Sequence, residues 1–245
     1  MILIAIGILV VLIAVPVIGY AMPSSQIFGR VYYRGKTDKK VVALSFDDGP
    51  NEPYTSQVLD ILDSYGIKGT FFAVGENVAL YPEVARRIVA GGHILGNHAT
   101  GHDANHALSH RGEQQIAAAQ DIIRSVTGVS PHLYRPPHGK KSPWELAYLK
   151  SHNMVAVNWS LATNDQHAFL NFGRPSPESF ASAIVRKAGP GKIILMHDGY
   201  GLNHDDALSD KSLTCKALPI IIKELKSEGY TFKTVPEILG VPGYN

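Results

Sequence analysis

The sequence contains a single cysteine, Cys215, so no disulfide can form within the chain. This cysteine stands at the start of a predicted helix and lacks a neighbouring His–Asn signature, and we interpret it as structural. The chain also lacks a dense basic patch, and its formal net charge at pH 7 is only +2. Nucleic acid is therefore not expected as a partner. The length of 245 residues allows one α/β domain of barrel size, or two small domains.

Residues 1–22 contain no charge and are almost wholly apolar. This length suits a membrane anchor, and it equally suits a signal peptide cleaved after Ala21. The basic segment that normally begins a signal peptide is missing. The first positive charges lie on the C-terminal side, at Arg30, Arg34, Lys36, Lys39 and Lys40. By the positive-inside rule this arrangement would leave the rest of the chain in the cytoplasm.

Residues 23–38 hold Pro, Ser, Gly and mixed charge and predict a short linker, followed by one domain over residues 39–245. In that domain strand-like and helix-like segments alternate seven times. The predicted strands are 41–46, 69–74, 93–95, 133–135, 154–159, 192–197 and 230–234. The predicted helices are 55–65, 82–90, 113–126, 144–151, 177–188 and 214–227. Repeated βα units imply a parallel sheet, either open or closed into a barrel.

Unusual polar residues fall at or just beyond the C-terminal ends of four of these strands. They are the Asp47–Asp48 pair, His98, Arg135 and His197. Active sites of β/α barrels are built from those strand ends. The sequence therefore favours a barrel over an open sheet, with a reaction centre at one end of it.

Asp47 and Asp48 end the apolar, β-branched strand 41–46. Because successive side chains of a strand point to opposite faces, the two carboxylates cannot do the same job. One can bind a metal while the other faces a reacting water. The simpler alternative is an ordinary turn, since Asp, Gly and Pro all favour turns.

His98 and His102 are four residues apart and can converge on one cation if the backbone between them is nearly helical. With a carboxylate from another strand they would leave one coordination position open, as catalytic metal sites require. The alternative is a solvated histidine-rich face. His106 and His110 continue the spacing, and for these two the solvated face is the preferred interpretation.

Two prolines follow Arg135 and stiffen the backbone beside its long side chain. Its guanidinium can pair with a carboxylate, and if that carboxylate is Asp47 the pair would keep a general base ionised. The alternative is a surface arginine beside a turn. At His138 we expect the backbone N–H to matter more than the ring. His197, at the end of a buried strand, suits general acid work near neutral pH, and the alternative is a structural histidine.

The loop after the fifth strand carries Trp159, which fits either the core or a platform on which a sugar stacks. Asp165 is the single acid in that loop. Together with the preceding segments, this loop completes a familiar order of motifs. They are Ser45-Phe46-Asp47-Asp48-Gly49-Pro50, the His98/His102 pair, Arg135-Pro136-Pro137-His138-Gly139, Asp165 and Ile194-Leu195-Met196-His197.

In these motifs the chain resembles the polysaccharide deacetylases of carbohydrate esterase family four, from about residue 39 to about residue 240. The resemblance implies a distorted (β/α) barrel of about seven parallel strands with helices outside. It also implies a divalent metal, usually zinc with cobalt or another divalent ion as substitutes, and removal of acetyl groups from acetylated sugars. The resemblance implies that Asp47 is the general base, held by Arg135, and that His197 is the general acid, tuned by Asp165. It implies that the metal ligands are Asp48, His98 and His102. Leu195 would form a wall of the acetyl pocket.

Three positions depart from the family pattern: Ala99 replaces Ser or Thr, His138 an aromatic residue, and Gln166 a Trp of the substrate groove. We therefore expect an active enzyme, but these changes leave the identity of its substrate undecided. The leading hypothesis is an exported or membrane-anchored, monomeric, metal-dependent deacetylase of peptidoglycan or chitin-type oligomers. Export is favoured despite the positive charges because such polymers lie outside the membrane. The alternatives are a hydrolase of small linear or cyclic amides, a non-catalytic sugar-binding module, and a hydrolase with a different metal and no sugar specificity.

Overall fold

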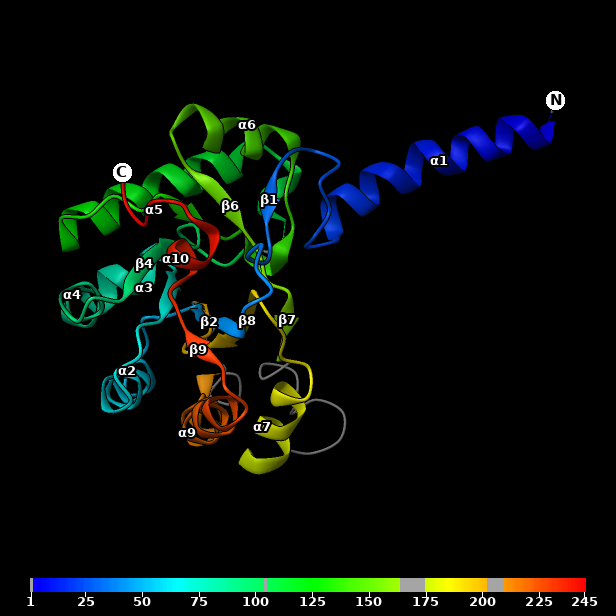
Figure 1. The fold of residues 1–245 in the computed structure, drawn as a ribbon. Coiled ribbons are helices and arrows are strands. Elements are labelled where there is room, and N and C mark those ends of the chain that lie inside the picture. Colours follow the sequence, from blue (N-terminus) through cyan, green and yellow to red (C-terminus); the bar gives the residue numbers. More distant parts are fainter. Residues whose placement is uncertain (1, 104, 164–174, 202–208) are drawn as a thin grey trace.

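A computed structural model describes residues 2–103, 105–163, 175–201 and 209–245, with the backbone alone for residues 2–6. Figure 1 shows a curled sheet surrounded by helices, with helix α1 (Ile2–Ala21) projecting away from this body. Asp165 and Gln166 lie outside the described residues, so their predicted roles are not addressed by the structure.

One sheet with parallel ladders between its strands forms the centre of the fold. Its strands are β1 (Val31–Tyr32), β2 (Val41–Asp47), β3 (Thr70–Ala73), β4 (Ile94–Asn97), β5 (Leu133–Tyr134), β6 (Val155–Val157), β7 (Leu161–Ala162), β8 (Lys192–His197) and β9 (Thr231–Phe232). The order is β1-β6-β5-β4-β3-β2-β8-β7, and β9 pairs with the start of β2. The predicted α/β architecture, a distorted barrel of parallel strands, is confirmed.

Strand β2 is the longest strand of the described residues, and all seven of its residues are buried. It lies between β3 and β8, and β8 matches it residue for residue from Val42 opposite Lys192 to Asp47 opposite His197. A strand buried on both faces explains why its sequence is a nearly continuous apolar run. The same burial carries Asp47 into the interior at the strand's end.

Helices cover the sheet on the outside. They are α2 (Tyr54–Ser64), α3 (Gly75–Leu80), α4 (Pro82–Ala90), α5 (Arg111–Thr127), α6 (Pro143–Ser151), α7 (Pro177–Val185), α9 (Ser212–Ser227) and α10 (Val235–Leu239). All six predicted helices are present, with ends that differ by a few residues. The short helices α3 and α10 and the two-residue strands β1 and β7 were not predicted. Such short elements carry too few residues to show a hydrophobic period.

The predicted linker is partly built into the domain. Strand β1 lies within residues 23–38 and pairs in parallel with β6, opposite Ala156 and Val157. Before it, the chain contacts the segments that follow β5 and β6. Lys141, after β5, donates through Nζ to the Met22 carbonyl at 2.5 Å, and Asn158, directly after β6, donates to the Pro23 carbonyl at 2.8 Å. Residues 22–32 are therefore attached to the sheet and its loops rather than spacing the domain from α1.

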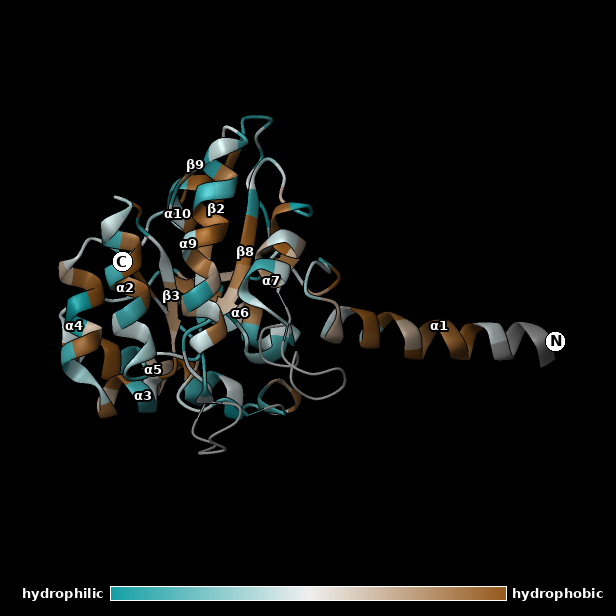
Figure 2. Ribbon diagram, turned by 90° about the horizontal axis from the view of Figure 1, so that it is seen from below, coloured by the Kyte–Doolittle hydropathy of each residue, from teal (hydrophilic) through white to brown (hydrophobic). Residues whose placement is uncertain are grey.

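Helix α1 consists almost wholly of apolar residues, and much of its ribbon is brown in Figure 2. Residues 8–13 are 56–64 % exposed. Its C-terminal end contacts the domain, since the Tyr20 carbonyl accepts a hydrogen bond from the Lys141 backbone N–H at 3.2 Å. In the part of the chain that the structure describes, no helix has the combined length and apolar character needed to cross a membrane.

Candidate active site

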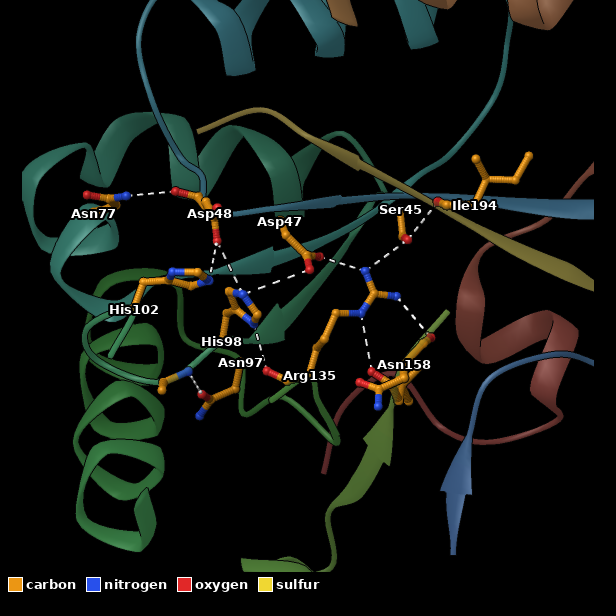
Figure 3. A network of polar contacts seen from close by, with 12 residues as sticks. Ser45, Asp47, Asp48, Asn77, Asn97, His98, His102, Arg135, Asn158 and Ile194 are labelled. Atoms are coloured by element: carbon orange, nitrogen blue, oxygen red, sulfur yellow. Dashed lines mark hydrogen bonds and ion pairs between the residues drawn. The ribbon is translucent and has the colours of Figure 1, made fainter. Parts of the chain in front are cut away.

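The predicted site residues of four different strands meet at one end of the sheet. Asp47 ends β2 and Asp48 follows it, His98 follows β4, and Arg135 follows β5 (Figure 3). His197 ends β8, which is the fourth strand. The carboxyl ends of neighbouring parallel strands share an edge, which is why residues far apart in sequence converge here. The sequence prediction that these residues gather at the C-terminal strand ends is in agreement with the structure.

Asp48, His98 and His102 each direct one potential metal-ligand atom toward a common point. Asp48 Oδ1 lies 3.2 Å from His98 Nε2 and 3.3 Å from His102 Nε2, and the three ligand atoms all lie within 4.8 Å of one another. His98 Nδ1 is 2.6 Å from the Arg135 carbonyl oxygen, which can only accept, so Nδ1 carries a proton and Nε2 is the nitrogen that faces Asp48. A positive charge, either a proton on Nε2 or a bound cation, joins this nitrogen to the buried carboxylate. Two imidazoles and one carboxylate suit zinc or a similar divalent ion.

The charges of the group support this assignment. Burial alone would raise the pKa of Asp48, but the facing imidazoles of His102 and His98 outweigh it and lower the pKa. Burial would lower the pKa of His98, yet the carboxylates of Asp47 and Asp48 raise it. Asp48 therefore stays ionised in the interior, as a metal ligand must.

Backbone turns, rather than a helix, bring the two histidines together. Ala99, directly after His98, has a left-handed backbone with φ of 65°, and Asn97 accepts a hydrogen bond from its N–H at 2.8 Å. The Asn97 amide in turn donates to the Ile116 carbonyl of α5 at 3.0 Å. A left-handed alanine is unfavourable by roughly 1 kcal/mol, so the surrounding hydrogen bonds hold this turn. His98 and His102 therefore converge without the nearly helical backbone that their spacing alone would require.

Arg135 holds Asp47. Its Nη1 donates to Asp47 Oδ1 at 2.6 Å, and both side chains are buried. The guanidinium also donates to Ser45 Oγ at 3.0 Å and to the carbonyl oxygens of Val157 and Asn158. The surface-arginine alternative is wrong, since Arg135 is fully buried. A charge-assisted bond of this kind fixes the orientation of the carboxylate.

The residues that support Arg135 were not predicted. Ser45 accepts from Arg135 and donates to the Ile194 carbonyl at 2.8 Å, so it joins β2, β5 and β8. The Phe72 ring lies 3.9 Å from the guanidinium carbon. A polar residue inside the apolar strand 41–46 was the available signal for Ser45. No sequence pattern points to Phe72, because its contact with Arg135 arises from the barrel alone.

His197 ends β8 directly opposite Asp47 in the parallel register. Asp198, the next residue, is fully buried and accepts a hydrogen bond from Thr55 Oγ1 at 2.6 Å. Burial raises the pKa of Asp198 to about 7. Asp198 packs so tightly that a Cβ at Gly49 would lie 2.1 Å from Asp198 Oδ2. Asp198 was not predicted, although a second acid at a strand end was visible in the sequence.

The predicted substrate-binding residues are placed at the rim of this site or behind it. His138 is exposed, has a left-handed backbone with φ of 56°, and its ring centroid lies 4.2 Å from that of His102. Trp159 is partly buried and packs against the turn at Gly139, where a Cβ would lie 2.9 Å from its ring. Leu195 is buried on β8 opposite Ser45. Contact with a substrate remains a prediction for all three.

Comparisons with known proteins agree with this geometry. The polysaccharide deacetylase family matches residues 34–157. A peptidoglycan-N-acetylglucosamine deacetylase of Bacillus cereus is 32 % identical over 212 residues, covering 86 % of this chain and 93 % of that protein. A chitooligosaccharide deacetylase of Bradyrhizobium sp. is 31 % identical over 211 residues, covering 84 % of this chain and 94 % of that protein.

The solved structures extend the likeness to three dimensions. The crystal structure of the peptidoglycan N-acetylglucosamine deacetylase Bc1960 superimposes with a TM-score of 0.77 at 28 % identity, covering 94 % of this chain and 97 % of that one. The resemblance noted in the sequence motifs is thereby confirmed. This chain belongs to the polysaccharide deacetylases of carbohydrate esterase family four.

Proposed function

We propose that this deacetylase removes N-acetyl groups from an N-acetylhexosamine polymer, using a divalent metal, zinc by preference, at Asp48, His98 and His102. The observation that carries the proposal is the convergence of these three ligand atoms, within 4.8 Å of one another, beside a buried carboxylate that is not needed as a ligand. Asp47, paired with Arg135, is that carboxylate.

The residues divide the chemistry between them. A divalent cation at this site would lower the pKa of a water molecule and polarise the acetamide carbonyl. Asp47 accepts a proton from the water as its oxygen bonds to the carbonyl carbon. His197 donates a proton to the nitrogen as the C–N bond breaks, so the products are acetate and a free amine. The backbone N–H of His138 stabilises the oxyanion, and Asp165 orients His197.

The substrate and its location follow from chemistry and from the relatives. Two relatives act, by their names, on peptidoglycan and on chitooligosaccharides, both polymers of N-acetylated sugars. Peptidoglycan lies outside the cytoplasmic membrane, so we propose export, with residues 1–22 as signal or anchor. We further propose a monomer. The basic residues between 30 and 40 remain an argument against this topology.

The test is acetate release by the full chain, purified in a mild detergent because α1 is apolar. Peptidoglycan and N-acetylglucosamine oligomers are offered separately, first after chelation and then after zinc is added back. Release that chelation abolishes and zinc restores supports the proposal, and the ratio of the two rates ranks the polymers. Activity that persists unchanged in fully chelated protein would refute the metal-dependent mechanism.

The alternatives give different results in the same assay. A hydrolase of small amides would act on acetamides or cyclic imides and leave both polymers untouched. A sugar-binding module would bind the oligomers without releasing acetate. The matched Asp47/His197 pair argues against a module, since binding alone needs neither a base nor an acid.

A further inference from the structure

The two histidine ligands are positioned in different ways. His98 donates from Nδ1 to the Arg135 carbonyl oxygen, and its side chain is 2 % exposed. Among the described residues no hydrogen bond to the His102 ring is found, and its side chain is 14 % exposed. Ligand histidines normally donate their second nitrogen to an acceptor that fixes the ring. The placement of His102 must therefore come from the loop that carries it.

That loop is anchored four residues further on, by His106 in the short 3-10 helix His106–Leu108. His106 is fully buried, and its Nδ1 lies 2.8 Å from the Asp103 carbonyl oxygen. Its Nε2 lies 3.4 Å from Oε1 of Glu145, a buried residue of α6. The expected solvated face is thus wrong for His106, while His110 is exposed as expected.

The proton positions link these two side chains. Since the Asp103 carbonyl can only accept, His106 carries its proton on Nδ1 and offers a lone pair at Nε2. Glu145 Oε2 already accepts from the Ser142 N–H and hydroxyl, at 3.0 Å each, which leaves Oε1 facing that lone pair. No other partner of Nε2 or Oε1 is found among the described residues. One proton between the two atoms removes the conflict of two facing acceptors.

The charges of the pair favour the same arrangement. Burial raises the pKa of Glu145 to about 7 and lowers that of His106 to about 4. Glu145 therefore holds a proton more tightly than His106 does, and the imidazole is uncharged at neutral pH. A neutral pair of this kind avoids the large cost of burying two charges.

A third element is shaped around the pair. At Gly112, in the first turn of α5, a Cβ would lie 2.3 Å from Glu145 Oε1 and 3.1 Å from the His106 carbonyl oxygen. Glycine is thus the residue that lets α5 approach the carboxyl group. Helices α5 and α6 and the His106 turn thus pack closely around one buried contact, that of His106 with Glu145.

We propose that His106 and Glu145 form a buried anchor that positions the His102 loop and thereby sets the metal affinity of the site. The inference rests on the proposed metal centre, and it makes both side chains positioning residues rather than ligands. It applies to the loop between β4 and α5, whose other end is fixed at Asn97.

The first measurement is the zinc dissociation constant of the full chain, by competition with a chromophoric chelator. Glu145→Leu removes the link to His106, and Gly112→Ala displaces the carboxyl group without altering either partner. Glu145→Gln keeps the link to His106, because the glutamine NH₂ group can donate to His106 Nε2 while its carbonyl oxygen accepts from Ser142. His110→Ala is the matched control in the same stretch. We expect zinc to bind about 10–100-fold more weakly in Glu145→Leu and Gly112→Ala, and nearly unchanged in the other two.

The second measurement needs no metal. Amide hydrogen exchange of residues 98–110 in metal-free protein should be about tenfold faster in Glu145→Leu than in the parent or Glu145→Gln. Unchanged exchange and unchanged zinc binding in folded Glu145→Leu would overturn the proposal, as would a Glu145→Gln variant as impaired as Glu145→Leu. A parent chain that binds no zinc would instead contradict the proposed metal centre, and the exchange experiment would still decide on the anchor.

Discussion

Asp47 and His197 are direct partners in the parallel register of β2 and β8. Partners on neighbouring parallel strands are about 4.8 Å apart along the sheet and project to the same face. The Asp198 N–H also donates to the Asp47 carbonyl at 3.2 Å, which fixes the two strand ends together. The distance between the proposed base and the proposed acid is therefore set by the pairing of β2 with β8.

Asp47→Asn should abolish the base while leaving the metal in place. Loss of a general base typically lowers the rate about 10²–10⁴-fold. Zinc content should stay near that of the parent, because Asp47 lies outside the ligand set of Asp48, His98 and His102. Acetate release and metal analysis of the same preparation provide the check. Near-parental turnover in this variant would show that another group is the base.

Asp48→Asn should have the opposite signature. The amide oxygen is neutral, so the ionised oxygen 3.2–3.3 Å from both histidines is lost. We expect zinc content to fall in dialysed protein and activity to fall with it, with partial recovery at high zinc concentration. If zinc remained stoichiometric after dialysis, Asp48 would not be a ligand, and the roles of the two aspartates would have to be exchanged.

Arg135→Lys should damage both stability and rate although it keeps the charge. The guanidinium donates to Asp47, to Ser45 and to two backbone carbonyls, and an ammonium on a flexible chain cannot reproduce this planar set. We expect a loss of about 2–4 kcal/mol in the free energy of unfolding, and at least a tenfold loss of kcat. Urea unfolding provides the first number and initial rates the second.

Arg124→Lys is the matched control for this change. Arg124 is mostly exposed on α5, where it pairs with Asp121 at 2.9 Å. An exposed pair of this kind contributes little, so stability and kcat should remain within experimental error of the parent. Equal effects of both substitutions would mean that Arg135 does not hold the base.

The fold could be predicted from sequence because its signals are local. The longer buried strands are apolar runs, and most of the longer covering helices repeat their apolar residues at helical spacing. The placement of the site at the C-terminal strand ends followed from the same reasoning. Short strands such as β1 (Val31–Tyr32) could not be predicted, because two residues show no hydrophobic period. They form a strand only because β6 lies beside them.

The interior of the site was less predictable. His106 and His110 continue the four-residue spacing of His98 and His102, yet His106 is fully buried and His110 is exposed. The chain between them is not a regular helix, so spacing does not decide which face each ring occupies. The partner of His106 is Glu145, 39 positions away along the chain, and such long-range contacts leave no trace in a single sequence.

The stability of the protein should depend on pH through Glu145. Its folded-state pKa is about 7, against 4.5 for the free side chain. A raised pKa means that the stabilisation is complete below pH 4.5 and is lost as the pH rises through 7. The loss relative to Glu145→Gln, which cannot titrate, should reach up to about 3 kcal/mol at pH 8. Urea unfolding of both proteins at pH 5 and pH 8 measures it, and a constant difference between them would contradict this titration.

The attachment of the N-terminal segment predicts that truncation will affect the active site. The Met22 and Pro23 carbonyls accept hydrogen bonds from Lys141 and Asn158, and the carbonyl of Asn158 in turn accepts from Arg135. A chain that begins at Gln26 leaves the buried Lys141 ammonium without this acceptor. A buried donor that loses its partner costs roughly 1–3 kcal/mol, and 1 kcal/mol shifts Tm by about 2–4 °C at this size.

The comparison is therefore between chains that begin at Met22 and at Gln26, both of which lack α1. We expect Tm to be lower by about 5 °C in the shorter chain. We also expect kcat to fall more than KM rises, because Asn158 acts on the base through Arg135 rather than on the substrate. Lys141→Met in the longer chain should reproduce part of the loss of Tm, since a thioether chain fills the same space without a charge. Identical Tm and kcat for the two chains would show that residues 22–25 rest on the domain without supporting the catalytic residues.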